Sequence, residues 1–66
     1  MKKRATKHER KMILSAYNQG RKDSLSNKFF DSPTNLMLHK AYSEGWADAV
    51  MSSEKTDDEI VNLVWG

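Results

Sequence analysis

The chain has 66 residues, no cysteine and a formal net charge of +2. A chain of this length forms at most one small domain, and the lack of cysteine excludes disulfide bonds and thiolate metal sites. No apolar run approaches the roughly 20 residues that a transmembrane helix needs, so we expect a cytoplasmic protein without membrane contact. Because so short a chain has little core of its own, we also expect a homodimer or a larger partner.

Charge is distributed unevenly along the sequence. Residues 1–28 hold nine lysines and arginines against two acidic residues, a balance of +7. Residues 29–66 hold two lysines against seven acidic residues, a balance of −5. A basic first half indicates nucleic-acid contact, but head-to-tail self-association or an acidic helix lying on a basic one would give the same pattern.

The first predicted element is a helix over residues 7–25, preceded by a basic flexible arm over residues 1–6. Thr6 and Glu9 have the spacing of a capping box, in which each side chain binds a backbone amide of the other residue at the helix start. Small and apolar residues follow at helical spacing and define one face. This face consists of Ile13, Ala16, Tyr17, Gly20 and Ser24.

Residues 26–31 show no periodicity and form the predicted link. Ser32 followed by Pro33 is typical of a helix start, because proline at the first helical position loses no hydrogen bond. We therefore predict a second helix over residues 33–52. Its apolar stripe consists of Leu38, Ala41, Tyr42, Gly45, Trp46 and Ala49.

A third, shorter helix is predicted over residues 57–65. Thr56 and Glu59 form a second capping-box pattern, and Ile60, Leu63 and Val64 share one face. An isolated helix of this length is marginal in water. We therefore expect it to dock, either on the other two helices or on a second chain, and residues 1–66 to form a single small helical domain.

The two longer helices contain related sequences 25 positions apart. Residues 16–25 and 41–50 share Ala, Tyr, Gly and Asp at equivalent positions. Glycine inside a helix costs up to about 1 kcal/mol relative to alanine, so a glycine in both copies indicates that the two backbones approach closely there. We predict an all-α fold, an antiparallel helical hairpin with a pseudo-two-fold internal repeat that crosses at Gly20 and Gly45, plus the short C-terminal helix.

The repeat also places polar residues at equivalent positions. Glu44 and Asp48 are one helical turn apart, and Gln19 and Asp23 are their counterparts. If Asp23 and Asp48 face each other, or meet Arg21, they could orient a ligand or a basic side chain of a partner. Otherwise these carboxylates face water.

The sequence predicts no enzyme. His8 and His39 lie on separate helices without the spacing of a metal site, and no serine has a plausible base beside it. There is also no glycine-rich phosphate loop. We expect a protein without a metal ion or other cofactor.

Three features of residues 16–50 are similar to features found together in one known family of proteins, whose link has a small polar residue, a proline and an aromatic residue. They are the Ala16…Gly20 spacing, the link Asn27-Lys28-Phe29, and the run Tyr42-x-x-Gly45-Trp46-x-x-Ala49. In these features the chain resembles the ribosome modulation factor family, small basic bacterial proteins, also phage-borne, with two helices and a connecting link. The basic segment from Met1 to Lys11 also suits this resemblance.

The resemblance implies a regulatory module that binds RNA or the ribosome and acts by occupancy rather than by chemistry. Its phosphate contacts would position the protein without reading sequence. The candidate phosphate-binding residues are Lys2, Lys3, Arg4, Lys7, Arg10, Lys11, Arg21 and Lys22.

Two other functions remain open. A small phage-type inhibitor or adaptor would bind a host protein through exposed aromatic side chains, and a ligand-sequestering oligomer would place Tyr17, Arg21, Tyr42 and Asp48 around a pocket. Phe29 and Phe30 could stack on bases, although paired aromatics in a hairpin link more often plug the open end of the core. The candidate partner- or ligand-binding residues are Tyr17, Phe29, Phe30, Tyr42, Trp46, Asp48 and Trp65.

Overall fold

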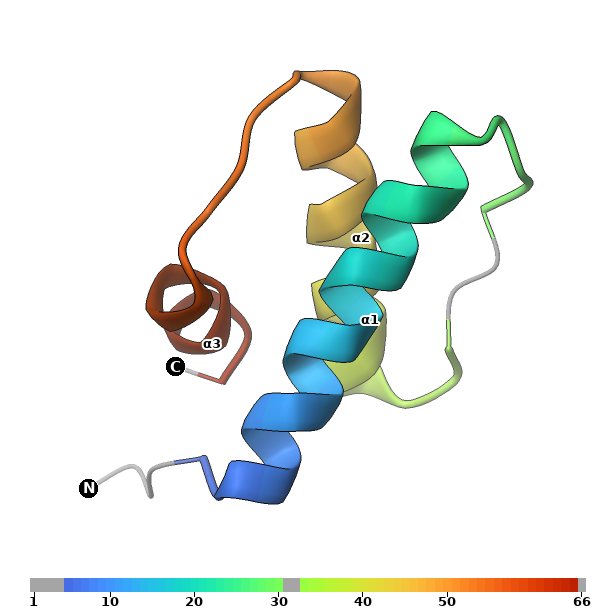
Figure 1. Ribbon diagram of the computed structural model, residues 1–66. Helices are drawn as coiled ribbons and strands as arrows, with labels where there is room; N and C mark the ends of the chain where they lie inside the picture. Colours follow the sequence, from blue (N-terminus) through green and yellow to red (C-terminus); the bar gives the residue numbers. More distant parts are fainter. Residues whose placement is uncertain (1–4, 31–32, 66) are drawn as a thin grey trace.

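The computed structural model describes residues 5–30 and 33–65. These residues form three α-helices, α1 (Lys7–Leu25), α2 (Leu36–Val50) and α3 (Asp57–Trp65), and contain no β-strand (Figure 1). The all-α prediction is confirmed: α1 and α2 pack closely as a helical hairpin, with the short α3 beside them. No helix in the described part of the chain is long and apolar enough to cross a membrane.

Both predicted capping boxes are present. Glu9 donates its backbone N–H to Oγ1 of Thr6 at 3.2 Å, and the Thr6 N–H is bound by Oε1 of Glu9 at 3.0 Å. At α3 the Glu59 N–H lies 3.3 Å from Oγ1 of Thr56, and the return bond is 3.4 Å long. Because these side chains satisfy amides that have no partner inside a helix, α1 and α3 begin where the sequence predicts.

The start of α2 differs from the prediction. Asn35, not Ser32, is the N-cap, because its Oδ1 accepts hydrogen bonds from the N–H groups of Met37 and Leu38 at 2.9 and 3.2 Å. Pro33 therefore precedes the helix, while Ser32 lies outside the described residues. α2 therefore spans Leu36–Val50, and the predicted range of 33–52 was too long at both ends.

α1 and α2 end in the same way. Asn27 and Ser52, the residues after the two C-caps, both adopt φ of 56°. The residue that follows each of them donates its N–H to the carbonyl of the repeated aspartate, at 2.9 Å to Asp23 and 2.7 Å to Asp48. This is the hydrogen bond of a Schellman cap. The internal repeat therefore continues through both helix ends.

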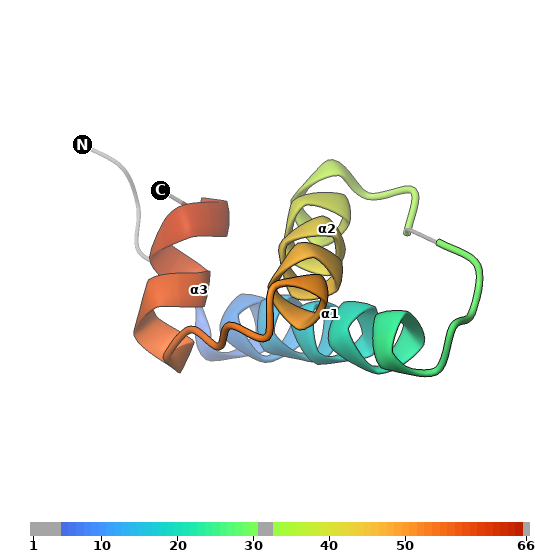
Figure 2. The same ribbon diagram turned by 90° about the horizontal axis from the view of Figure 1, so that it is seen from above.

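The direction of α2 relative to α1 corrects the antiparallel arrangement that we predicted. The C-terminal ends of the two helices lie at the same end of the molecule in Figure 1, and Figure 2 shows α2 crossing over α1. Ten residues of extended chain, as in the link over residues 26–35, can span about 33 Å. The 15 residues of α2 rise only about 22 Å. The link is therefore long enough to run from the C-terminal end of α1 back toward its N-terminal end before α2 begins.

The predicted glycine crossing is confirmed. A Cβ atom on Gly20 would lie 2.1 Å from the carbonyl oxygen of Tyr42, and a Cβ atom on Gly45 would lie 1.9 Å from the carbonyl oxygen of Tyr17. Both contacts are with backbone, which has no room to move aside. The two glycines therefore allow the helix backbones to touch.

α3 docks on its own chain rather than requiring a second copy. Its buried residues Ile60, Val61 and Val64 complete a core with Ile13, Tyr17 and Ala41 from the other two helices. Leu63, which we had placed on the docking face, is 49% exposed. Successive helix residues are about 100° apart, so the face that docks is rotated by about 50° from the predicted one, and Val61 takes the place of Leu63.

Candidate functional site

The two copies of the repeat exchange a buried hydrogen bond across the glycine crossing. The Tyr17 hydroxyl of α1 donates to Oδ2 of Asp48 on α2, and the Tyr42 hydroxyl of α2 donates to Oδ2 of Asp23 on α1 at 2.6 Å. Neither aspartate is more than 7% exposed, and each tyrosine is 1% exposed. The hypothesis that the two aspartates face each other is therefore wrong. Each aspartate meets the tyrosine of the opposite helix instead.

The Tyr17–Asp48 pair is closed by an ammonium group. Lys55, in the link after α2, places Nζ 2.9 and 2.8 Å from the two carboxylate oxygens of Asp48, and 3.1 Å from Oε2 of Glu44. The Lys55 backbone N–H also donates to the Tyr17 hydroxyl oxygen at 3.3 Å. The Glu44 and Asp48 carboxylates, which would repel each other on an isolated helix, therefore share one cation.

These contacts fix the charge of each group. Burial raises the pKa of Asp48, but the hydrogen bonds from Lys55 and Tyr17 outweigh it, and the pKa lies below its usual value. The hydrogen bond to Asp48 raises the pKa of Lys55. Burial, followed by the hydrogen bond to Asp48, raises the pKa of Tyr17. At neutral pH the site therefore holds a charged ion pair beside a neutral phenol.

The Tyr42–Asp23 pair has different surroundings. The Gln19 side-chain amide donates to Oδ1 of Asp23 at 2.7 Å. The hydrogen bond from Tyr42, aided by that of Gln19, lowers the pKa of Asp23 against the opposing effect of burial. The Phe30 ring packs edge-on against Tyr42 and Trp46, with centroid distances of 5.2 and 5.4 Å. In the described part of the chain Asp23 has no ion-pair partner.

The candidate pocket around Tyr17, Arg21, Tyr42 and Asp48 is occupied by the protein itself. Both tyrosines and Asp48 are almost fully buried against each other, and Arg21 donates from Nη1 to the backbone carbonyl oxygen of Ser53. These four residues therefore hold the hairpin together. We assign them a structural role in place of the ligand-binding role considered from sequence.

The candidate aromatic residues divide into packed and exposed ones. Phe30 packs edge-on against Trp46 but is 48% exposed, so it covers this end of the helix pair only in part. Trp65 is half-buried against the core. Phe29, which we had grouped with Phe30 in the plug, is 93% exposed. Among the candidates only Phe29 is exposed over nearly its whole ring.

The candidate phosphate-binding residues divide in the same way. Arg10 forms an ion pair with Asp58 of α3 at 2.7 Å, and Arg21 binds Ser53 as described above. Lys7, Lys11 and Lys22 are exposed. Their spacing of 4 and 11 residues places them on one side of α1, away from the buried residues of that helix, and we call them the lysine face. Lys2, Lys3 and Arg4 lie outside the described residues.

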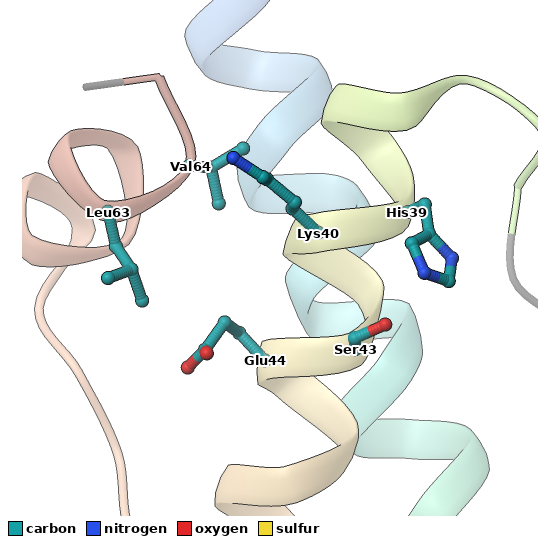
Figure 3. A pocket seen from close by; sticks show the side chains of 6 residues that line it. All are labelled: His39, Lys40, Ser43, Glu44, Leu63 and Val64. Carbon is teal, nitrogen blue, oxygen red and sulfur yellow. The ribbon is translucent and has the colours of Figure 1, made fainter.

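Two grooves were not foreseen from the sequence. One, of about 360 Å³, lies between α2 and α3, with Lys40 and Glu44 on the α2 side and Leu63 on the α3 side (Figure 3). The other, of about 450 Å³, lies along α1 next to the lysine face. It is lined by His8, Lys11, Met12, Ser15, Ala16, Gln19 and Leu38. Periodicity gave no signal for either groove, because both depend on the direction in which the helices cross.

The described residues contain no group of three or more His, Cys, Asp or Glu side chains arranged to hold a metal ion. Comparisons of the chain with protein-family models, with curated proteins and with solved structures find no significant match. The functional argument therefore rests on the surfaces of this molecule.

Proposed function

We propose that the protein is a non-enzymatic RNA-binding module, with the ribosome as its target, that regulates by occupying its binding site. The lysine face is the observation that carries this proposal. Lys7, Lys11 and Lys22 point away from the core and have no hydrogen-bond or ion-pair partner in the described part of the chain. Cations held along one side of a rigid helix suit a phosphate backbone.

The groove beside the lysine face supports a single-stranded RNA target. Met12, Ala16 and Leu38 give it apolar lining, while Lys11 and His8 lie in the same wall. Single-stranded RNA presents unstacked bases and phosphates side by side, and proteins bind it by combining apolar contact with cations. A base in the groove with its phosphate at Lys11 satisfies both requirements.

The resemblance of residues 16–50 to ribosome modulation factors favours ribosomal RNA within this class. The chain departs from that family at Arg21, where the family has an aromatic residue, and at Lys28, where it has proline. Both positions lie outside the lysine face. The departures therefore count against the ribosome as target more than against the helix pair, whereas the lysine face does not depend on them.

The proposal is tested by measuring binding to a labelled single-stranded RNA, and to ribosomes, over a series of salt concentrations. If six of the candidate lysines and arginines contact phosphates, a plot of the logarithm of the binding constant against the logarithm of the salt concentration has a slope of about −4 on single strands. Replacing Lys7, Lys11 and Lys22 together by glutamine should flatten it by about 2. The matched control is Lys40→Gln, an exposed lysine on α2. An intact protein that binds no RNA at low salt, or a triple variant that binds like the control, would refute the proposal.

A protein-binding role is the second candidate, supported by exposed apolar residues at one end of the hairpin. Leu25 and Val50, the last residues of α1 and α2, are each 68% exposed, and Met51 is 66% exposed. The two helix ends lie at the same end of the molecule (Figure 1). A host protein or a second copy of the chain would cover this surface. Native mass spectrometry at micromolar concentration tests the homodimer, and Leu25→Glu should abolish it.

A further inference from the structure

The repeat permits a position-by-position comparison of the surroundings of its two aspartates. Asp23, Gln19 and Phe30 are equivalent to Asp48, Glu44 and Lys55, each pair being 25 positions apart. In the second copy the Lys55 ammonium lies against the carboxylates of Asp48 and Glu44. In the first copy the equivalent of Lys55 is a phenylalanine, whose ring packs on Tyr42 and Trp46 instead.

A pocket lies beside Asp23 in the first copy. It has a volume of about 560 Å³, and its walls are Gln19, Asp23, Asn27, Lys28 and Phe29. Gln19 and Asp23 are the counterparts of the two residues that hold the Lys55 ammonium. Two of the pocket's walls therefore correspond to the two residues that hold an ammonium group in the other copy of the repeat.

We propose that this pocket binds a primary ammonium group, which forms an ion pair with the Asp23 carboxylate. A carboxylate offers about four acceptor sites, and Tyr42 and Gln19 each use one of those on Asp23. Gln19 donates through Nε2, which leaves its Oε1 as the acceptor that corresponds to the Glu44 carboxylate. An ammonium group has three N–H donors and matches these oxygens.

Two further features of the pocket select for a cation. Asp23 is 93% buried as a residue and carries its negative charge among side chains that donate only two hydrogen bonds to it. A carboxylate in such a place gains most from a cationic partner and repels a phosphate or another anion. The exposed ring of Phe29 lines the same pocket and supplies the aromatic face that binds ammonium groups.

Lys28 provides an internal competitor and thus a sharp test. It lines the pocket, its charge contributes to lowering the pKa of Asp23, and it forms no ion pair with Asp23. If the pocket binds an external ammonium group, Lys28 opposes that binding by repulsion. Removing the charge of Lys28 should then strengthen binding. If Lys28 itself were the occupant, its removal would also vacate the pocket, but it would destabilise the fold as well, so an unchanged free energy of unfolding in Lys28→Met identifies Lys28 as a repulsive neighbour rather than the occupant.

The experiment is an NMR titration of the full chain with n-butylammonium, a mimic of the lysine side chain, at constant ionic strength. The amides of Asn27, Lys28 and Gln19 should shift and saturate. Asp23→Asn should weaken binding about tenfold or more. Phe29→Ala, which removes a fully exposed ring and leaves the core intact, should weaken it about two- to fivefold. Lys28→Met should strengthen it about two- to fivefold.

Two arms of the titration separate the sources of the ammonium group. Acetyl-Gly-Lys-Gly-amide represents the lysine side chain of a partner protein, and putrescine represents a free diamine; the tighter ligand identifies the source. Tetramethylammonium, which carries charge but no N–H donor, should bind more weakly than n-butylammonium. Shifts that never saturate, that persist unchanged in folded Asp23→Asn, or that are unaffected by both Phe29→Ala and Lys28→Met would overturn the proposal.

Discussion

The two Tyr–Asp pairs share a scaffold and differ in what closes them. Each pair joins α1 to α2, each lies beside a glycine of the crossing, and each aspartate also accepts the N–H that ends its own helix. Around the Tyr17–Asp48 pair the neighbours are the charged Lys55 and Arg21. In the repeat, Lys55 corresponds to Phe30 and Arg21 corresponds to Trp46. The neighbours of the Tyr42–Asp23 pair are therefore two aromatic rings.

The comparison distinguishes two groups of residues. One group is common to both copies and forms the crossing, and the other differs between the copies and sets the chemistry on each side of it. The tyrosine, glycine and aspartate of each copy are buried and contact the opposite helix, so they define the geometry. Lys55 closes one side and immediately precedes Thr56, the residue that caps α3. The charged side therefore anchors the link that leads to α3, while the aromatic side fixes the link between α1 and α2 through Phe30.

The largest effect should follow from adding one methyl group at the crossing. Gly20→Ala and Gly45→Ala each place a Cβ about 2 Å from a carbonyl oxygen of the other helix, so the backbones must separate. Each should cost about 3 kcal/mol or more of the free energy of unfolding, the upper end of overpacking effects. Urea denaturation measures this, with Ser15→Ala on the exposed side of α1 as a matched control. Equal losses support a symmetric crossing, and a loss at only one glycine contradicts it.

A smaller and unequal effect should follow from neutralising the two aspartates. Asp48→Asn leaves the Lys55 ammonium against a neutral amide in a site where Asp48 is 1% exposed. Removing one partner of a buried pair costs about 3 kcal/mol, and partial exposure of Lys55 reduces this to about 2 kcal/mol. Asp23→Asn keeps an acceptor for Tyr42 and breaks no ion pair, so its loss should be smaller. The comparison fails if Asp23→Asn proves the more damaging variant in urea denaturation.

Much of the fold could be predicted because it depends on local pattern. The capping boxes at Thr6 and Thr56 fixed two helix starts, since their hydrogen bonds span only three residues. The glycines could be placed at the crossing because glycine in a helix interior needs a reason. The start of α2 was missed because Asn35 and Ser32 both have the side chain of an N-cap, and nothing local decides between them.

The site was harder to predict because it depends on how the helices cross. Periodicity places Tyr17 on the buried face of its helix, but it does not say which residue of the opposite helix Tyr17 meets, and it leaves open whether Asp48 meets that helix or water. The partner of Asp48 also comes from outside any helix, since Lys55 lies in a link without periodicity. Lys55 and Phe30 occupy equivalent positions 25 residues apart, but they lie beyond residues 16–25 and 41–50, where the two copies are similar, and they share no chemistry that would mark them as equivalent.

The pH dependence of stability should separate the two sides. Both aspartates have lowered pKa values in the folded state, so the unfolded chain binds more protons, and stability falls as pH drops below about 4. Tyr17 and Lys55 have raised pKa values, so the folded chain keeps protons that the unfolded chain loses, and stability falls as pH rises above about 10. Thermal unfolding at a series of pH values should show both losses. Lys55→Met should reduce the alkaline loss and leave the Asp23 part of the acid loss in place.

The smallest effect should come from the ion pair that joins α1 to α3. Arg10 and Asp58 are 2.7 Å apart, but their side chains are 40% and 79% exposed. Water and salt screen such a pair, so a double-mutant cycle with Arg10→Ala and Asp58→Ala should give a coupling of about 0.5 kcal/mol or less. A coupling as large as that of the Lys55–Asp48 pair would contradict this.

Because the Arg10–Asp58 pair is weak, Arg10 can exchange Asp58 for a phosphate at little cost. Asp58→Ala should therefore leave stability almost unchanged and raise RNA affinity at low salt, whereas the same substitution at Asp57, which has no pair with Arg10, should raise it less.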